Sequence, residues 1–115
     1  MTRPLFLLCA LATVAAFAQD AGNAGAVAVS ASLEPQKIHE ECMRLEAGQK
    51  RAYHWKASAP VDFNVHYHRG SDVFYPVKSE GMRGDGGTLV AKTSEDYCWM
   101  WSTRDKAAKV DGQIK

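Results

Sequence analysis

Two histidines, His66 and His68, stand one residue apart in the segment VDFNVHYHRGSD, and this spacing could hold a metal ion. In an extended strand, residues i and i+2 face the same side, so both imidazoles could reach one ion. Asp72 follows four residues after His68, where a carboxylate ligand could stand. Imidazole and carboxylate ligands suit zinc or copper.

Apolar and polar side chains alternate around this pair with the period of two that is typical of half-buried strands. The alternation predicts strands over residues 51–57 and 61–68, joined as a hairpin around Ala59-Pro60. In such a hairpin, the polar face of the first strand would bring His54 beside the histidine pair as a third ligand. The opposite face would be buried and would comprise Tyr53, Trp55, Phe63 and Val65.

The polar face has a second interpretation, as an ordinary exposed sheet surface that holds no metal. The histidines would then hydrogen-bond to water and to the neighbouring Asp62 and Asn64. We favour this interpretation and therefore expect no cofactor. The alternative is a copper- or zinc-binding periplasmic protein whose ligands are His54, His66, His68 and Asp72.

A second notable run is Tyr97-Cys98-Trp99-Met100-Trp101. If Cys98 and Met100 point inward, the aromatic residues Tyr97, Trp99 and Trp101 form an exposed stripe that could bind a sugar, a peptide or another subunit. If the aromatic residues form the core, Cys98 lies on the outer face. Large aromatic side chains are usually buried, which favours the second arrangement.

The first eighteen residues have the pattern of a secretory signal peptide. A positive start is followed by the apolar run PLFLLCALATVAAF and by the small residues of Ala16-Phe17-Ala18. We expect export to the periplasm or the medium. Residues 19–36 are rich in Ala, Gly and Ser and predict a flexible segment, and residues 37–115 then form one small domain.

Cleavage of this leader would leave two cysteines, Cys42 and Cys98, in an oxidising compartment. A cysteine pair in a small exported domain predicts a disulfide. Two thiolate metal ligands are the rival interpretation, but the pair lacks the short C-x-x-C spacing of common zinc sites.

Further short alternating runs follow near residues 73–77, 87–93, 96–102 and 109–114, separated by turn residues. Pro76 predicts an edge position for the first of these runs. Six to seven short strands with almost no helix pattern predict an all-β fold, an antiparallel β-sandwich of the jelly-roll kind.

Two segments, YHWKASAPVDFNVHYH and GGTLVAKTSEDYCWMWSTRDKAAKVDGQI, resemble the Golgi-dynamics (GOLD) domain over residues 41–114. The resemblance implies a β-sandwich used for protein–protein or protein–lipid association. It also implies a disulfide at positions similar to Cys42 and Cys98. The sequence predicts no coiled coil or membrane helix after the sandwich, so only the binding module carries over from cargo receptors of that family.

The sequence predicts a binding protein and not an enzyme. It has no G-x-S-x-G or H-E-x-x-H motif, and we expect no catalytic residues. The formal charge is +1 for the whole chain and includes Arg3 of the leader, so nothing predicts a nucleic acid partner. After the leader, no apolar run approaches the length of a membrane span. The expected partner is an unidentified protein or small ligand.

Overall fold

Residues 25–115 form six antiparallel strands and contain no helix. The computed structural model describes these residues; the signal peptide predicted for residues 1–18 lies outside them, as do residues 19–24 of the predicted flexible segment. The strands are β1 (Val27–Leu33), β2 (Ile38–Leu45), β3 (Lys50–Arg69), β4 (Asp72–Val90), β5 (Glu95–Ser102) and β6 (Ala108–Ile114). The predicted all-β class is confirmed.

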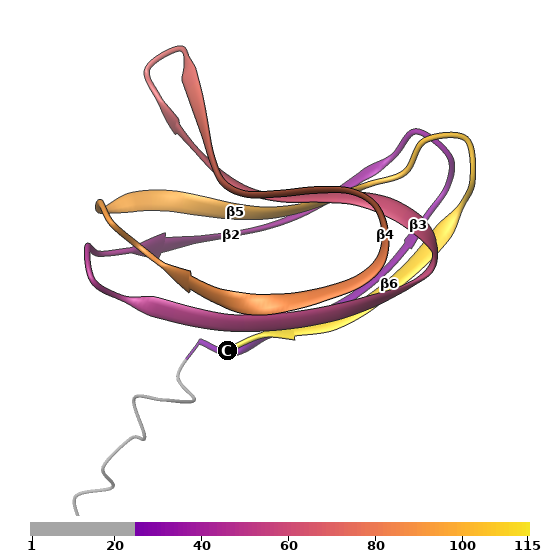
Figure 1. Ribbon diagram of the computed structural model, residues 1–115, viewed down its shortest axis with the longest axis horizontal. Coiled ribbons are helices and arrows are strands. Elements are labelled where there is room, and N and C mark those ends of the chain that lie inside the picture. Colours follow the sequence, from indigo (N-terminus) through magenta and orange to yellow (C-terminus); the bar gives the residue numbers. More distant parts are fainter. Residues whose placement is uncertain (1–24) are drawn as a thin grey trace, which may run out of the picture.

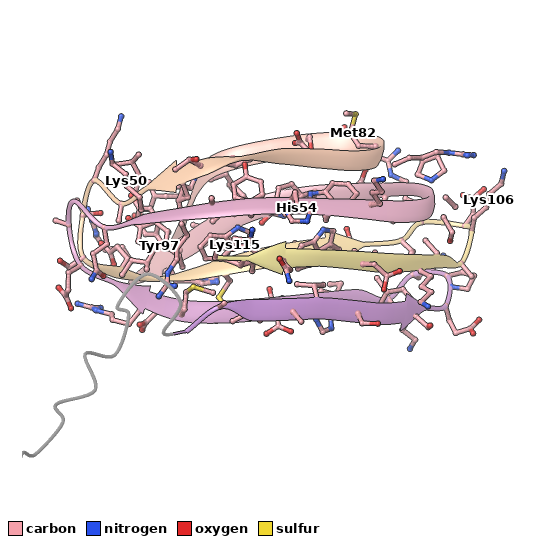
Figure 2. All side chains as sticks on the ribbon, turned by 90° about the horizontal axis from the view of Figure 1, so that it is seen from below. Lys50, His54, Met82, Tyr97, Lys106 and Lys115 are labelled. Atoms are coloured by element: carbon pink, nitrogen blue, oxygen red, sulfur yellow. A yellow bond between two sulfur atoms is a disulfide. The ribbon has the colours of Figure 1, made fainter. Side chains whose placement is uncertain are left out.

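A long hairpin of β3 and β4 organises the fold. One edge of β3 pairs with β4, whereas its other edge pairs first with β6, at residues 53–57, and then with β5, at residues 62–66. The first half of β3 therefore lies in a layer ordered β1-β6-β3-β4, and its second half lies in a layer ordered β2-β5-β3-β4. In Figure 1 the hairpin of β3 and β4 bends back on itself, so that the two layers face each other. Figure 2 shows the strands of the first layer lying side by side.

The bend lies where we predicted a turn around Ala59-Pro60. Here β3 continues as one strand, and its pairing with β4 shifts register between Lys56 and Val61 and again before Phe63. Pro60 cannot donate to a ladder, and irregular pairing of this kind bends a strand sharply. The predicted hairpin is therefore wrong: residues 51–57 and 61–68 are two halves of one strand.

The core fills the space between the two layers. Tyr53, Trp55, Phe63 and Val65 are all buried, as their alternation predicted. The ring of Phe63 lies 5.2 Å from that of Trp55 and 5.3 Å from that of Trp101, measured between centroids, so aromatic packing joins the two halves of β3 to β5. Contacts of this kind stabilise beyond the area they bury.

Strand β1 corrects the prediction of a flexible segment over residues 19–36. Residues 27–33 pair along their whole length with β6, and Val29 and Leu33 are buried. Every second residue of β1 faces the core. The small side chains between Val29 and Leu33 conceal this alternation in the sequence. For residues 27–33 the prediction is wrong.

The sheet edges differ in how well they are covered. Strands β1 and β2, at the ends of the two layers, approach each other, whereas β4 pairs only with β3 and has a free outer edge. Among residues 25–115, no helix has the length and apolar character needed to span a membrane.

Candidate functional site

The four predicted metal ligands do not converge. His54 lies exposed in the first layer, opposite Gly86 and Gln113, whereas His66 and His68 lie in the second layer. Asp72 stands at the hairpin turn, opposite Arg69. The predicted set is wrong because it rested on a turn at residues 58–60, and the continuous strand instead carries His54 away from the pair.

His66 is buried although it lies on the outer face of its layer. It is 5% exposed, and its Nδ1–H donates a hydrogen bond of 2.7 Å to Asn64 Oδ1. Its Nε2 lies 3.6 Å from Glu40 Oε1, and the rings of Tyr75 and His68 lie beside it. The predicted hydrogen bonding is present, but the surface there is more covered than we expected.

Burial lowers the pKa of His66. The loss of hydration disfavours the charged imidazolium, and the nearby His68 acts in the same direction, while the carboxylate of Glu40 partly opposes them. His66 is therefore a neutral imidazole at pH 7, with the proton on Nδ1 and a free lone pair on Nε2.

Cys42 and Cys98 form the predicted disulfide, with an S–S distance of 2.05 Å. The two residues are direct partners in the pairing of β2 with β5. Cys42 is exposed and Cys98 is half-buried, so the bond lies on the outer face of the second layer.

Tyr97, Trp99 and Trp101 are 1%, 0% and 1% exposed. The alternative in which they form a binding surface is therefore wrong, and the arrangement with the aromatic residues in the core is confirmed. The inner face of β5 is covered by the hydrophobic core, to which all three side chains belong.

The exposed apolar side chains lie elsewhere, on β4. Within the described residues, six large hydrophobic side chains are exposed, and only Ile38 among them lies off this strand. Three are consecutive, Val73, Phe74 and Tyr75, next to the turn at Gly70 and Ser71. We call residues 67–75 the hairpin tip; it projects from the body of the molecule (Figure 1). The signal in the sequence was the run VFY, which interrupts the alternation and so places apolar groups on both sides of the strand.

The hairpin tip is internally ordered by aromatic and ionic contacts. Tyr67 and Phe74 stack with their centroids 5.1 Å apart, and the guanidinium of Arg69 lies 5.7 Å and 5.4 Å from the two rings. Arg69 Nη2 also lies 2.5 Å from Glu95 Oε1 on β5. These contacts restrain the tip, so less conformational entropy is lost when it meets a partner.

A cleft opens beside the hairpin tip, between the two ends of β4. Its volume is about 630 Å³, and Tyr67, Phe74, Leu89 and Tyr97 line it together with the polar groups of Thr88 and Lys92. The tip and this aromatic cleft form one continuous surface, which is the candidate binding site.

Three solved structures with low sequence identity are among those similar to this one. The periplasmic inhibitor of g-type lysozyme (PliG) from Aeromonas hydrophila is 15% identical with a TM-score of 0.54, over 84% of this chain and 90% of that one. The mitogen of Yersinia pseudotuberculosis is 6% identical with a TM-score of 0.54, over 78% and 84% of the two chains. The PliG of Salmonella Typhimurium is 18% identical with a TM-score of 0.48, over 78% and 87%.

No family model and no curated protein matches the chain. The resemblance to the GOLD domain therefore stays a prediction. At these identities the similar structures show the fold alone: an all-β domain of the architecture that PliG also has.

Proposed function

We propose that this protein is an exported, non-enzymatic inhibitor that binds a lysozyme and blocks its substrate cleft with the hairpin tip. The observation that carries the proposal is the concentration of exposed apolar side chains on β4, above all at Val73, Phe74 and Tyr75. Exposed apolar groups gathered on a projecting element mark interaction sites in soluble proteins.

The shape of the tip suits an enzyme's cleft. A narrow projection can enter a concave site that a flat sheet face cannot, and aromatic residues and arginine are the usual centres of binding energy in such interfaces. The tip supplies Arg69, Phe74 and Tyr75 close to its turn, and the guanidinium of Arg69 lies over the ring of Phe74. The aromatic cleft beside it can accept a side chain from the rim of the enzyme.

Two further features support a lysozyme as the partner. The A. hydrophila PliG, whose fold this chain shares, is a periplasmic inhibitor of g-type lysozyme. Export, predicted from residues 1–18 and supported by the disulfide, would bring the protein to the compartment in which lysozymes act. The GOLD resemblance supports the same general class, a β-sandwich that associates with proteins.

The test is inhibition of purified lysozymes of the g-, c- and i-types acting on bacterial cell walls. We expect the protein to inhibit at least one type. The variant Phe74→Ser/Tyr75→Ser should lose inhibition by at least about tenfold, because central aromatic side chains each contribute more than about 1.4 kcal/mol.

The matched control is Ile38→Ser. Ile38 is 61% exposed and lies on β2, away from the hairpin tip, so its replacement removes a similar apolar group from another surface. It should leave inhibition unchanged. The proposal is wrong if no lysozyme is inhibited, or if both variants weaken inhibition equally.

A further inference from the structure

Three potential metal ligands form a row across the outer face of the second layer. Cys42 on β2 pairs with Cys98 on β5, and Cys98 in turn pairs with His66 on β3. Glu40 stands two residues before Cys42, on the same face of β2. Four side chains with ligand atoms of three kinds thus lie on one face of three neighbouring strands.

The group is compact enough to hold a single ion once the S–S bond of 2.05 Å is broken and the two sulfur atoms separate. A carboxylate oxygen of Glu40 and the two sulfur atoms lie within 4.8 Å of one another. They are the one group of three such residues this close within residues 25–115. The Nε2 atom of His66 lies 3.6 Å from Glu40 Oε1, which places the imidazole at the edge of the same group.

His66 is held ready to act as a ligand. Its Nδ1–H is fixed by Asn64 Oδ1 at 2.7 Å, and both side chains are buried. A hydrogen bond from one ring nitrogen to a fixed acceptor is the usual way in which proteins orient a metal-binding histidine and set its tautomer. The lone pair of Nε2 is left free on the side of Glu40.

We propose that Cys42 and Cys98, when reduced, form a zinc site together with Glu40 and His66. Two thiolates, one imidazole and one carboxylate are a ligand set that suits tetrahedral Zn²⁺. The disulfide and the zinc ion are then alternative cross-links between β2 and β5. The protein holds one of them according to the thiol redox state of its surroundings.

The conversion needs a dithiol as reductant. Its thiolate attacks one sulfur of the disulfide, which breaks the S–S bond and forms a mixed disulfide; its second thiol then displaces the protein. Two electrons pass to Cys42 and Cys98, and the dithiol becomes a disulfide. The exposure of Cys42 gives the reductant access. Each cysteine thiol loses its proton on binding Zn²⁺, so metal uptake releases protons.

The experiment compares the oxidised protein with protein reduced by a dithiol, which is then removed without oxygen. Zn²⁺ is titrated by calorimetry, and Co²⁺ is added separately because thiolate ligation gives it a characteristic charge-transfer absorption. We expect one Zn²⁺ per reduced chain with a micromolar or tighter Kd, a thiolate band with Co²⁺, and a raised Tm on loading with zinc. The oxidised protein should bind at least about 100-fold more weakly, because its sulfur atoms cannot be thiolates.

Variants of the two other ligands locate the site. Glu40→Gln and His66→Gln should each weaken zinc binding by at least about tenfold, since even outer-shell changes cost 10–100-fold. The side chain of Glu40 is 42% exposed, so its replacement leaves the fold intact and keeps the test valid if His66→Gln unfolds. The matched control is His39→Gln/Glu41→Gln, a His–Glu pair 2.9 Å apart on the opposite face of β2, which should bind zinc as the unaltered protein does.

Three results would overturn the proposal. The reduced protein could fail to bind zinc or to refold around it, Glu40→Gln could leave the affinity unchanged, or the control pair could lower it as much. Zinc binding by Glu40→Gln is a test separate from lysozyme inhibition, because Glu40 lies on β2 and no side chain of the hairpin tip is changed. Inhibition is not compared in His66→Gln, because the ring of His66 lies 5.8 Å from that of Tyr75 in the tip.

Discussion

The exposure of His66 differs from what its position in the alternating pattern predicts. The alternation correctly assigns it to the outer face, yet it is 5% exposed because groups from three strands cover it. These are Glu40 from β2, His68 from β3 itself and Tyr75 from β4. A buried neutral imidazole makes the stability of the fold depend on pH.

We predict that the free energy of unfolding falls as the pH drops below about 6.5, the usual pKa of histidine. Burial lowers the pKa of His66 in the folded state, so the unfolded chain binds more protons in this range and is favoured by acid. The contribution of His66 to stability is fully present above its pKa in the unfolded chain. It declines as the pH falls toward the lower pKa of the folded protein. Urea unfolding at a series of pH values measures the slope.

The variant His66→Gln should make this slope shallower, because it removes the titrating group and keeps a polar side chain at the site. His54→Gln is the control, since His54 is exposed in the other layer. Equal slopes in His66→Gln and the unaltered protein would show that His66 does not cause the acid sensitivity.

At the scale of elements, β1 behaves as part of the core. It closes one end of the first layer, and Val29, which is 3% exposed, joins the hydrophobic cluster. We predict that Val29→Ala lowers the free energy of unfolding by about 2 kcal/mol, through lost burial and the space left behind. Ser32→Ala, at an exposed position of the same strand, should change it by less than about 0.5 kcal/mol. If β1 were flexible, denaturant titrations would show equally small changes in the free energy of unfolding for Val29→Ala and Ser32→Ala.

The sequence predicted some elements well and others poorly, for physical reasons. Alternation over residues 53–67 identified the buried face, because large apolar groups at every second position have no other stable arrangement. It could not distinguish a turn at Ala59-Pro60 from a bulge in one strand, since proline is compatible with both. It also missed β1, where the side chains between Val29 and Leu33 are too small to mark the pattern.

The candidate site could be predicted even less, because it is a property of the whole molecule. The alternation of apolar and polar side chains shows which face of the sheet a residue lies on, but not which other residues cover that face. It left open whether Tyr97, Trp99 and Trp101 would form an exposed stripe or the core, and the answer depends on how the strands pack. The disulfide was predictable because a cysteine pair without the short C-x-x-C spacing, in a chain expected to be exported, favours a disulfide over thiolate metal ligands.

The long hairpin also determines how the molecule unfolds. Strands β3 and β4 belong to both layers, and the rings of Trp55 and Phe63 pack across the bend against Trp101. Neither layer can open without exposing the core side chains that both layers cover. We therefore expect one cooperative transition, as in most single domains of this size.

This cooperativity predicts that a destabilising substitution in one layer lowers the free energy of opening equally in both layers. Amide hydrogen exchange reports the free energy of opening at each strand, and we compare Val110 of β6 in the first layer with Trp99 of β5 in the second. Val29→Ala, a substitution in β1 of the first layer, should lower both free energies by the same amount, about 2 kcal/mol. Ser32→Ala should lower neither. A loss confined to Val110 would mean that the two layers open separately, in spite of the strands that they share.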